Sequence, residues 1–259
     1  YGPFSKYRFL SAAYLFTISL FLYFKAKGYY AIGLYPVFIA FGAAYMGSLS
    51  YRGWKMIIPP LSLAVPVLLF IPVYRVAFPN RSPAYIQEHA GLYRKFGLLR
   101  WEDGKDHALP QDFADMLGWR ELAVKVDSCY AQMPDPETTL VLCDNYGEAG
   151  AINYYSAKGI RAVSFNADYI NWFDLKTTYK HLIRVKESGS RETELEKTSP
   201  YFESSVAADS IKNPFAREYG TTVFVFKNAK ININERIAAE LAQKQSAWLQ
   251  LPSQEHKQQ

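Results

Sequence analysis

Two groups of residues in this sequence carry side chains suited to phosphates and sugars. The first group is a short basic segment that contains Lys25, Lys27 and Tyr30. A lysine ammonium is a compact charge that can meet a phosphate, and a phenol hydroxyl can donate one more hydrogen bond. The competing interpretation is that these lysines only extend to a membrane interface, as lysines beside apolar helices commonly do.

The second group follows two apolar segments predicted as strands, residues 138–143 and 160–165. Its members are the candidate glycan-binding residues Asn145, Glu148, Asn166, Tyr169 and Trp172. Ligands of parallel α/β sheets lie beyond the carboxyl ends of the strands, where these residues are expected. A purely structural interpretation is somewhat favoured, because Asn145 can cap a helix and Trp172 can fill core space.

Other kinds of site find little support in the sequence. The four histidines are scattered without the paired spacing of zinc ligands: His89, His107, His181 and His256. The sequence has no glycine-rich phosphate loop, so neither a metal nor another cofactor is expected. Cys129 and Cys143 could pair in an oxidising exterior, but two buried thiols are favoured because nothing in the sequence brings them together.

The first 76 residues predict a membrane segment. Three apolar runs, residues 9–24, 31–46 and 56–74, approach the ~20 residues that cross a ~30 Å hydrocarbon core. Only the third run reaches that length without its flanking residues. Together the runs predict three transmembrane helices, at about residues 9–24, 30–47 and 55–76.

The charge of the chain is divided unevenly between its two parts. Residues 1–76 hold seven basic residues and no acidic one, whereas the remaining 183 residues hold 22 basic and 24 acidic residues. The excess of positive charge therefore belongs to the membrane segment, and membrane lipids are expected partners. Because no basic stripe with interleaved aromatic residues follows that segment, nucleic acid is not an expected partner.

The basic residues also predict the orientation of the membrane segment. Lys6 and Arg8 precede the first run, and Arg52 and Lys55 precede the third, so the positive-inside rule places both of these ends in the cytoplasm. The first loop and everything after Arg75 are then external. The two lysines of that loop run against the rule, which is why a functional role for them is considered.

The sequence after the membrane segment predicts a linker at 77–108, an α/β domain at 109–250 and a disordered polar tail at 251–259. Helices are predicted at residues 83–95, at 112–133 with an interruption at Gly118, at 149–157 with an end at Gly159, and at 233–249 with Asn232 or Asn234 as the cap. Strands are predicted at residues 138–143, 160–165, 179–186 and 221–227. Strand, helix and strand in so few residues predict a mostly parallel sheet.

Four separated blocks of this sequence resemble one family. They are LPQDFADMLGW at residues 109–119, DNYGEAGAI at 144–152, NPFARE at 213–218 and KGYYAIGLYP at 27–36. In their order and spacing along the chain, these four blocks resemble the C-terminal portion of bacterial family 39 glycosyltransferases. These are integral membrane enzymes of the GT-C class, related to protein O-mannosyltransferases and to the lipid A aminoarabinose transferase.

The resemblance implies a reaction and a place for it. Such an enzyme takes a sugar from a polyprenyl-phosphate carrier on the outer face of the bacterial inner membrane and gives it to a lipid, glycan or protein acceptor. The external α/β domain is then periplasmic. In that family the catalytic aspartate lies in the first external loop, which this sequence does not include, so we assign no catalytic residue and expect the chain to be the C-terminal part of a longer protein.

The resemblance also bears on the two candidate groups. It favours Lys27 and Tyr30 as contacts of the carrier phosphate and leaves Lys25 undecided. It gives no catalytic role to Asp112, Asp115 or Glu148. The alternative function, from a different class, is a non-catalytic, membrane-anchored module whose external domain binds a glycan or a partner protein.

The orientation can be tested with fusions. We expect a reporter fused after Arg75 or at the C-terminus to be active in the periplasm and one fused at Gly53 to be active in the cytoplasm, because the basic residues flank the cytoplasmic ends. Periplasmic and cytoplasmic reporter enzymes measure the two orientations. Cytoplasmic labelling of a cysteine placed between residues 200 and 210 would overturn the assignment.

Overall fold

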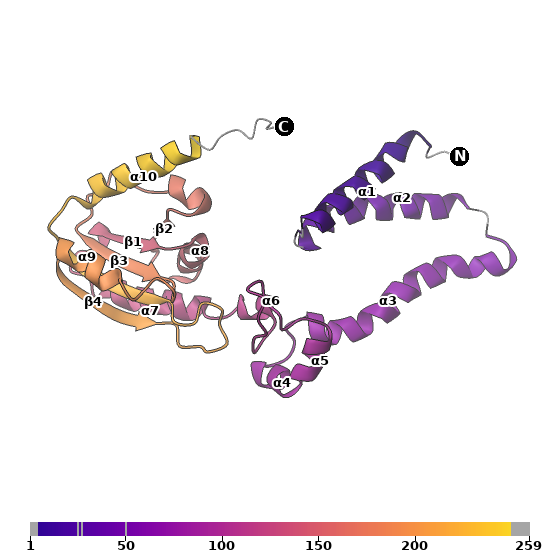
Figure 1. The fold of residues 1–259 in the computed structure, drawn as a ribbon, viewed down its shortest axis with the longest axis horizontal. Helices are drawn as coiled ribbons and strands as arrows, with labels where there is room; N and C mark the ends of the chain where they lie inside the picture. Colours follow the sequence, from indigo (N-terminus) through magenta and orange to yellow (C-terminus); the bar gives the residue numbers. More distant parts are fainter. Residues whose placement is uncertain (1–4, 25, 27, 50, 250–259) are drawn as a thin grey trace, which may run out of the picture. The chain divides into compact units, whose positions relative to one another are not determined.

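The chain forms two compact units, Tyr1–Ala77 and Phe78–Gln259. The structure is a computed structural model that describes residues 5–24, 26, 28–49 and 51–249 (Figure 1). The polar tail predicted at residues 251–259 lies outside the described residues.

The first unit consists of three helical stretches. Its elements are η1 (Ser5–Tyr7), α1 (Arg8–Tyr23), η2 (Gly28–Leu34), α2 (Tyr35–Ser48), η3 (Gly53–Ile57) and α3 (Ile58–Ala77). Two continuous helices, Tyr29–Ser48 with 20 residues and Gly53–Ala77 with 25, are long and apolar enough to cross a membrane. At 16 residues, α1 is shorter than the ~20 that a crossing needs. The structure therefore supports two of the three predicted transmembrane helices and does not confirm the first.

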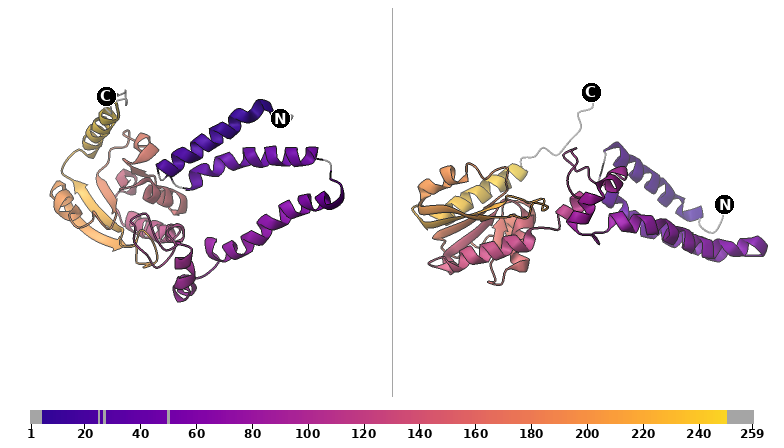
Figure 2. Two further views of the ribbon diagram at one scale, coloured as in Figure 1. Left: turned by 45° about the vertical axis from the view of Figure 1, so that its right-hand side comes forward. Right: turned by 90° about the horizontal axis from the view of Figure 1, so that it is seen from below.

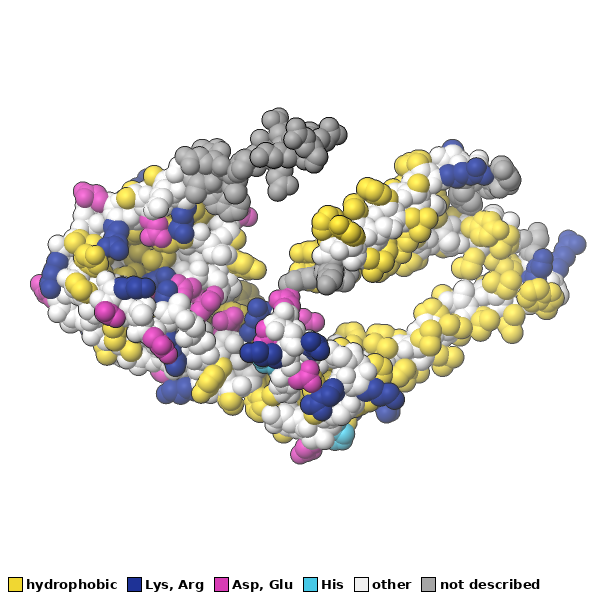
Figure 3. Space-filling view, in the orientation of Figure 1, with side chains coloured by type: hydrophobic (Ala, Val, Ile, Leu, Met, Phe, Trp, Pro, Cys, Tyr) yellow, Lys and Arg dark blue, Asp and Glu magenta, His cyan; other side chains and the backbone are white. Residues whose placement is uncertain are grey.

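The surface of the first unit is apolar. Leu63 of α3 is 74% exposed and Leu69 is 66% exposed, and hydrophobic side chains cover much of the unit in the space-filling view (Figure 3). Within the unit, α1 packs on α2 through rings such as those of Tyr14 and Phe38, whose centroids are 4.5 Å apart. So much exposed apolar surface is costly in water and favours a hydrocarbon environment.

The second unit begins with short helices. The single helix predicted at residues 83–95 is divided into α4 (Pro83–Glu88) and α5 (Ala90–Lys95). The division falls at His89, whose backbone leaves the helical region (φ −106°, ψ 22°) while its ring stacks on Tyr85 at 4.0 Å. The segment then leads to α6 (Gln111–Ala114).

A five-stranded sheet forms the centre of the second unit. Its strands are β1 (Thr139–Cys143), β2 (Ala162–Ser164), β3 (His181–Lys186), β4 (Phe202–Ser210) and β5 (Thr222–Ala229), in the order β2-β1-β3-β5-β4. The β1 strand pairs in parallel with both β2 and β3, as the strand-helix-strand pattern predicts. However, β5 pairs antiparallel with both β3 and β4. The sheet is therefore mixed, and the prediction of a mostly parallel sheet is not confirmed.

The edge strand β4 lacks the usual sequence signal of a strand. The β4 strand reads FESSVAADS and lies at the edge of the sheet, where only Phe202 is fully buried. Such an edge strand needs no apolar alternation, so the usual strand signal is absent. Because β4 was not predicted, its antiparallel pairing with β5 was not predicted either.

Helices cover both faces of the sheet (Figure 2). On one face, α7 (Trp119–Ala131) and α8 (Tyr146–Tyr155) pack against side chains such as Val141, Ile183 and Val225. On the other face, α10 (Ile233–Leu249) packs against the alternate side chains, among them Leu140, Leu182 and Phe226. Short helices complete the unit: η4 (Pro136–Thr138), η5 (Ala167–Asn171), α9 (Glu194–Thr198) and η6 (Ser199–Tyr201). The result is a three-layered α/β unit with two hydrophobic cores.

Side-chain caps fix where the helices begin. Asn145 caps α8 in a reciprocal box with Glu148, as a helix-capping interpretation of Asn145 predicts. Asn232 rather than Asn234 caps α10, since its side-chain oxygen accepts from the Glu235 backbone N–H (3.2 Å). Asn234 instead accepts from the Tyr179 backbone N–H (3.0 Å) and so holds the entry to β3. Cys129 and Cys143 are both free thiols, and Cys143 is buried.

Gly118 permits the sharp turn before α7. The helix predicted at residues 112–133 is interrupted here, as expected, between α6 and α7. The glycine has a φ of +88°, and a Cβ built on it would be 3.0 Å from Ala216 Cβ and 3.2 Å from Ile211 Cγ2. Both the backbone and the neighbouring side chains therefore require glycine at this position.

Replacing Gly118 should cost more than replacing a glycine of similar backbone in open space. Gly159 has a φ of +64° with nothing within 4 Å of a built Cβ. We expect Gly159→Ala to lose ~1–2 kcal/mol of unfolding free energy from the left-handed backbone, and Gly118→Ala to lose ~1–3 kcal/mol more from overpacking. Urea unfolding of residues 78–259, followed by circular dichroism, measures both. Equal losses in the two variants would contradict the packing argument.

Candidate functional site

Three of the blocks that carry the family resemblance meet at one place in the second unit. We call this place the motif junction: residues 109–119, 144–152 and 213–218. A Cβ built on Gly147, at the start of α8, would lie 3.4 Å from Cη2 of Trp119, at the start of α7. The Arg217 backbone N–H donates to the Ala114 carbonyl oxygen (3.2 Å). Segments separated by 25 residues or more in the sequence are thus in direct contact.

Carboxylates hold the junction together. Both oxygens of Asp115 accept from Arg217 Nη1, at 3.2 and 3.1 Å. Glu121 of α7 accepts from the backbone N–H groups of Lys212 (2.8 Å) and Asn213 (3.3 Å). Hydrogen bonds that involve a charged group are stronger than neutral ones, so these contacts fix the third block against α6 and α7. Asp115 therefore acts here as a structural residue.

A hollow of about 210 Å³ borders the junction beside Arg217. It is lined by Trp101, Glu102, Asp103, His107, Gln111 and Arg217. The Trp101 indole stacks on His107 with ring centroids 3.8 Å apart and donates to the Leu109 carbonyl oxygen (2.8 Å). His107 Nε2 lies 2.9 Å from Asp103 Oδ2. A hydrogen bond from the Lys105 backbone, and then that from His107, lower the pKa of Asp103.

This hollow has the chemistry of a polar ligand site. A guanidinium, an imidazole, an amide and carboxylates supply both donors and acceptors, and Trp101 supplies an aromatic wall. Such a set can bind the hydroxyls of a sugar. None of the candidate glycan-binding residues predicted from the sequence lines it. In the sequence, the only sign of this hollow is that Trp101 and His107 flank a turn at Gly104. That pattern is also typical of an ordinary loop.

Asn145 and Glu148 are brought together, but by helix capping. Glu148 is fully buried, and its Oε2 accepts from the backbone N–H groups of Asp144 (2.9 Å) and Asn145 (3.2 Å). The Asn145 side chain accepts from the Glu148 backbone N–H (2.9 Å) and donates to Glu187 (2.7 Å). These contacts give both residues structural roles, and a role in glycan binding stays a prediction.

Burial changes the acidity of Glu148. Desolvation raises its pKa to about 8, against the lowering effect of the Asn145 backbone N–H, and the charges of Asp144, Glu218 and Glu187 raise it further. No side chain or backbone group in the described part of the chain bonds its other oxygen, Oε1. Burial therefore favours the protonated form of Glu148.

Asn166, Tyr169 and Trp172 lie on the segment after β2. Tyr169 and Trp172 are in contact, with ring centroids 4.2 Å apart, and the Tyr169 hydroxyl lies close to Gly150 of α8. Trp172 is 57% exposed and lines a separate hollow of about 210 Å³ together with Tyr130 and Tyr179. The five predicted residues thus form two pairs, Asn145 with Glu148 and Tyr169 with Trp172, and Asn166 is exposed beside them.

The candidate phosphate contacts are described only in part. Lys25 and Lys27 lie outside the described residues. Tyr30 belongs to η2 and is 55% exposed. Its ring lies 4.6 Å from that of Tyr29 and 6.3 Å from that of Phe21, near the end of α1. Tyr30 is therefore available at the surface of the first unit, and its phosphate contact remains a prediction.

Comparison of the chain with protein families, curated proteins and solved structures finds no match.

Glu148 should make the stability of the second unit depend on pH. Its folded-state pKa of about 8 lies above the ordinary value of 4.5, so between these values the folded protein holds a proton that the unfolded chain has released. Its contribution to stability is present at low pH and is lost as pH rises towards 8, by at most ~1.4 kcal/mol per pH unit. Glu148→Gln, which keeps the capping oxygen, should lose this dependence.

A matched variant separates this effect from general pH sensitivity. Burial raises the pKa of Glu121, but hydrogen bonds from Lys125 and the Lys212 backbone outweigh it and lower that pKa. The difference between wild type and Glu121→Gln should therefore be flat from pH 5 to 8, whereas that for Glu148→Gln should slope. Urea unfolding of residues 78–259 at several pH values measures both. A flat difference for Glu148→Gln would show that Glu148 is ionised in the folded state.

Proposed function

We propose that this chain is the C-terminal part of an integral membrane glycosyltransferase. The enzyme moves a sugar from a polyprenyl-phosphate carrier to a lipid, glycan or protein acceptor on the periplasmic face of the bacterial inner membrane. The observation that carries the proposal is the motif junction, because three blocks chosen by their resemblance to family 39 glycosyltransferases are in contact with one another. A site shared by these blocks requires such contact, so the geometry is consistent with the proposal.

The first unit supplies a second line of support. It holds two helices of membrane-crossing length, and it lacks acidic residues entirely in its sequence. We assign α1 as a third crossing helix, with its flanking residues extending it, because its side chains are apolar and it packs on α2. The charge distribution then directs the second unit to the periplasm.

We assign a different role to each unit from the residues that it contains. The loop with Lys27 and Tyr30 meets the carrier phosphate at the membrane surface. Departure of the sugar leaves a phosphate whose growing negative charge an ammonium and a phenol stabilise. The catalytic aspartate comes from the external loop that this sequence does not include. The second unit presents the hollow beside Arg217 to the sugar part of a donor or acceptor.

One alternative has its own support. A non-catalytic module that binds a glycan or a partner protein needs no catalytic aspartate, and the hollow lined by Trp101, His107 and Arg217 would serve it equally well. The two functions differ in whether the complete gene product turns over a lipid-linked sugar. Absence of turnover, together with glycan binding by the second unit, would favour the module.

The carrier site can be tested by substitution in the complete gene product. Loss of one donor to a developing oxyanion costs ~2.7–4 kcal/mol in comparable sites, so Lys27→Ala should reduce transfer ~100-fold or more and Tyr30→Phe by less. Lys27→Arg should restore only part of the activity, since a planar guanidinium presents its charge differently. A transfer assay at limiting carrier concentration measures these effects.

Lys55→Ala is the matched control, because it removes a lysine from the opposite, cytoplasmic end of a membrane helix. It should leave transfer nearly unchanged. Residues 78–259 alone should transfer no sugar, because they lack both the carrier loop and the catalytic aspartate. Near-normal turnover by Lys27→Ala would instead assign Lys27 to the membrane interface alone.

A further inference from the structure

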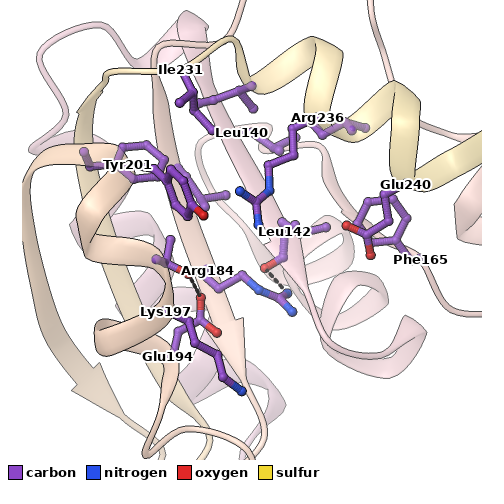
Figure 4. Close-up of a pocket in the computed structure, with 15 residues that line it drawn as sticks. Leu140, Leu142, Phe165, Arg184, Glu194, Lys197, Tyr201, Ile231, Arg236 and Glu240 are labelled. Atoms are coloured by element: carbon purple, nitrogen blue, oxygen red, sulfur yellow. Dashed lines mark hydrogen bonds between the residues drawn. The ribbon is translucent and has the colours of Figure 1, made fainter.

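A further cavity lies on the opposite face of the sheet from α7 and α8. It has a volume of about 260 Å³ and is enclosed by β1, β3, α9, η6 and α10 (Figure 4). It shares no lining residue with the hollow beside Arg217. We call it the α10 cavity.

The floor of the α10 cavity is apolar. It is formed by aliphatic and aromatic side chains of both sheet and helix: Leu140, Leu142, Leu182, Phe202, Ile233 and Ile237. These side chains offer no hydrogen bonds, and a polar group buried against them without a partner would be destabilising. The floor therefore suits a hydrocarbon chain better than the hydroxyls of a sugar.

The rim of the α10 cavity is charged, and most of its charges are already paired. Arg184 crosses the cavity with its side chain 15% exposed and pairs with Asp144. Glu194 accepts from Thr198 (2.7 Å) and lies 3.8 Å from Lys186. In each case both partners are largely removed from water, so these groups are satisfied within the protein.

Two cations of the rim remain without a carboxylate partner. Glu240 lies 4.0 Å from Lys244, whereas Arg236 and Lys197 have no acidic partner within 4.0 Å in the described part of the chain. Arg236 reaches from α10 across the cavity mouth (Figure 4), and its guanidinium lies 4.6 Å from the ring centroid of Tyr201. Arg236 is exposed, and this contact leaves the N–H donors of its guanidinium available to a ligand.

We propose that the α10 cavity binds an amphiphilic anion. The ligand is an acyl or alkyl chain with a carboxylate or monophosphate head. Its chain lies on the floor below α10, and its head bonds Arg236, with Lys197 adding positive charge at the rim. At about 260 Å³ the cavity is slightly smaller than the ~300–1,000 Å³ of drug-sized sites, so it accommodates a short chain or the end of a longer one.

This ligand site is independent of the proposed transferase reaction. The hollow beside Arg217 contributes no residue to it, and its chemistry needs only an apolar floor and an unpaired guanidinium. Binding therefore remains testable whether or not the complete gene product transfers a sugar.

The test uses the full chain in nanodiscs of zwitterionic lipid with a photoreactive octyl phosphate that carries a diazirine at the end of its chain. Mass spectrometry of the crosslinked peptides should place the label on residues 231–240 or on β1 and β3. Unlabelled octyl phosphate and octanoate should compete, whereas inorganic phosphate, 1-octanol and glucose 6-phosphate should not. Competition by glucose 6-phosphate at the same concentration would overturn the amphiphile assignment in favour of an anionic sugar.

Variants test the two halves of the site separately. Arg236→Gln should weaken octyl phosphate binding ~10-fold or more, because a bond to a charged group is lost, and Lys197→Gln should weaken it less. Ile237→Phe places a larger side chain on the floor of the cavity and should reduce labelling by the octyl phosphate probe. The melting temperature of this variant reports whether the second unit is still folded. Arg120→Gln, an exposed arginine on α7, is the matched control and should bind normally.

One further competition experiment distinguishes a membrane lipid from a soluble amphiphile as the natural ligand. Phosphatidic acid added to the nanodiscs should displace the probe if the natural ligand is a membrane lipid, and should leave labelling unchanged if it is a soluble amphiphile; labelling of the cavity supports the site in both cases. Labelling spread evenly over the chain, or unaffected by Arg236→Gln, would overturn the proposal.

Discussion

The second unit depends on one buried carboxyl group at the end of β1. Glu148 accepts from the two backbone N–H groups that follow the strand, and so ties the start of α8 to the end of β1. Gly147, beside it in the sequence, lies against Trp119 at the start of α7. Burial raises the pKa of this carboxyl to about 8, which favours its neutral form in the core. The motif junction depends on this turn together with the contacts of Asp115 and Glu121.

Much of the fold could be predicted from the sequence because its signals are local. The β1 strand is largely apolar, β3 and β5 show alternation, and Gly118 interrupts a helical spacing where the structure turns. The strand β4 could not be predicted, because it is an exposed edge strand without apolar alternation, and the antiparallel pairing of β3 with β5 leaves no signal in the residues of either strand. In the first unit the apolar runs predict helices, but 16 residues of α1 do not by themselves decide whether that helix crosses a membrane.

The candidate sites were harder to predict, because they join residues from distant parts of the chain. The sequence offered Asn145 both as a cap and as a ligand contact, and the structure supports the cap. Arg217 gave no sign that it would border a hollow with Trp101. From the sequence alone, Arg236 is an ordinary solvated charge on an amphipathic helix. Only the packing of α10 over the sheet places it beside a cavity. Spacing can indicate pairs within one helix, such as Glu240 with Lys244, but it does not show which charges pair between distant elements.

Asp144 connects the two faces of the second unit. Its backbone N–H bonds Glu148 at the motif junction, while its carboxylate pairs with Arg184 and accepts from Lys186 (2.9 Å) and Ser190 (2.9 Å). Opposing charges hold the pKa of Asp144 low although burial acts to raise it, so the carboxylate is a fixed anchor. Since Arg184 lines the α10 cavity, a ligand there that shifted Arg184 would act on the turn that forms the motif junction. Asp144 thus contacts residues of both the motif junction and the α10 cavity.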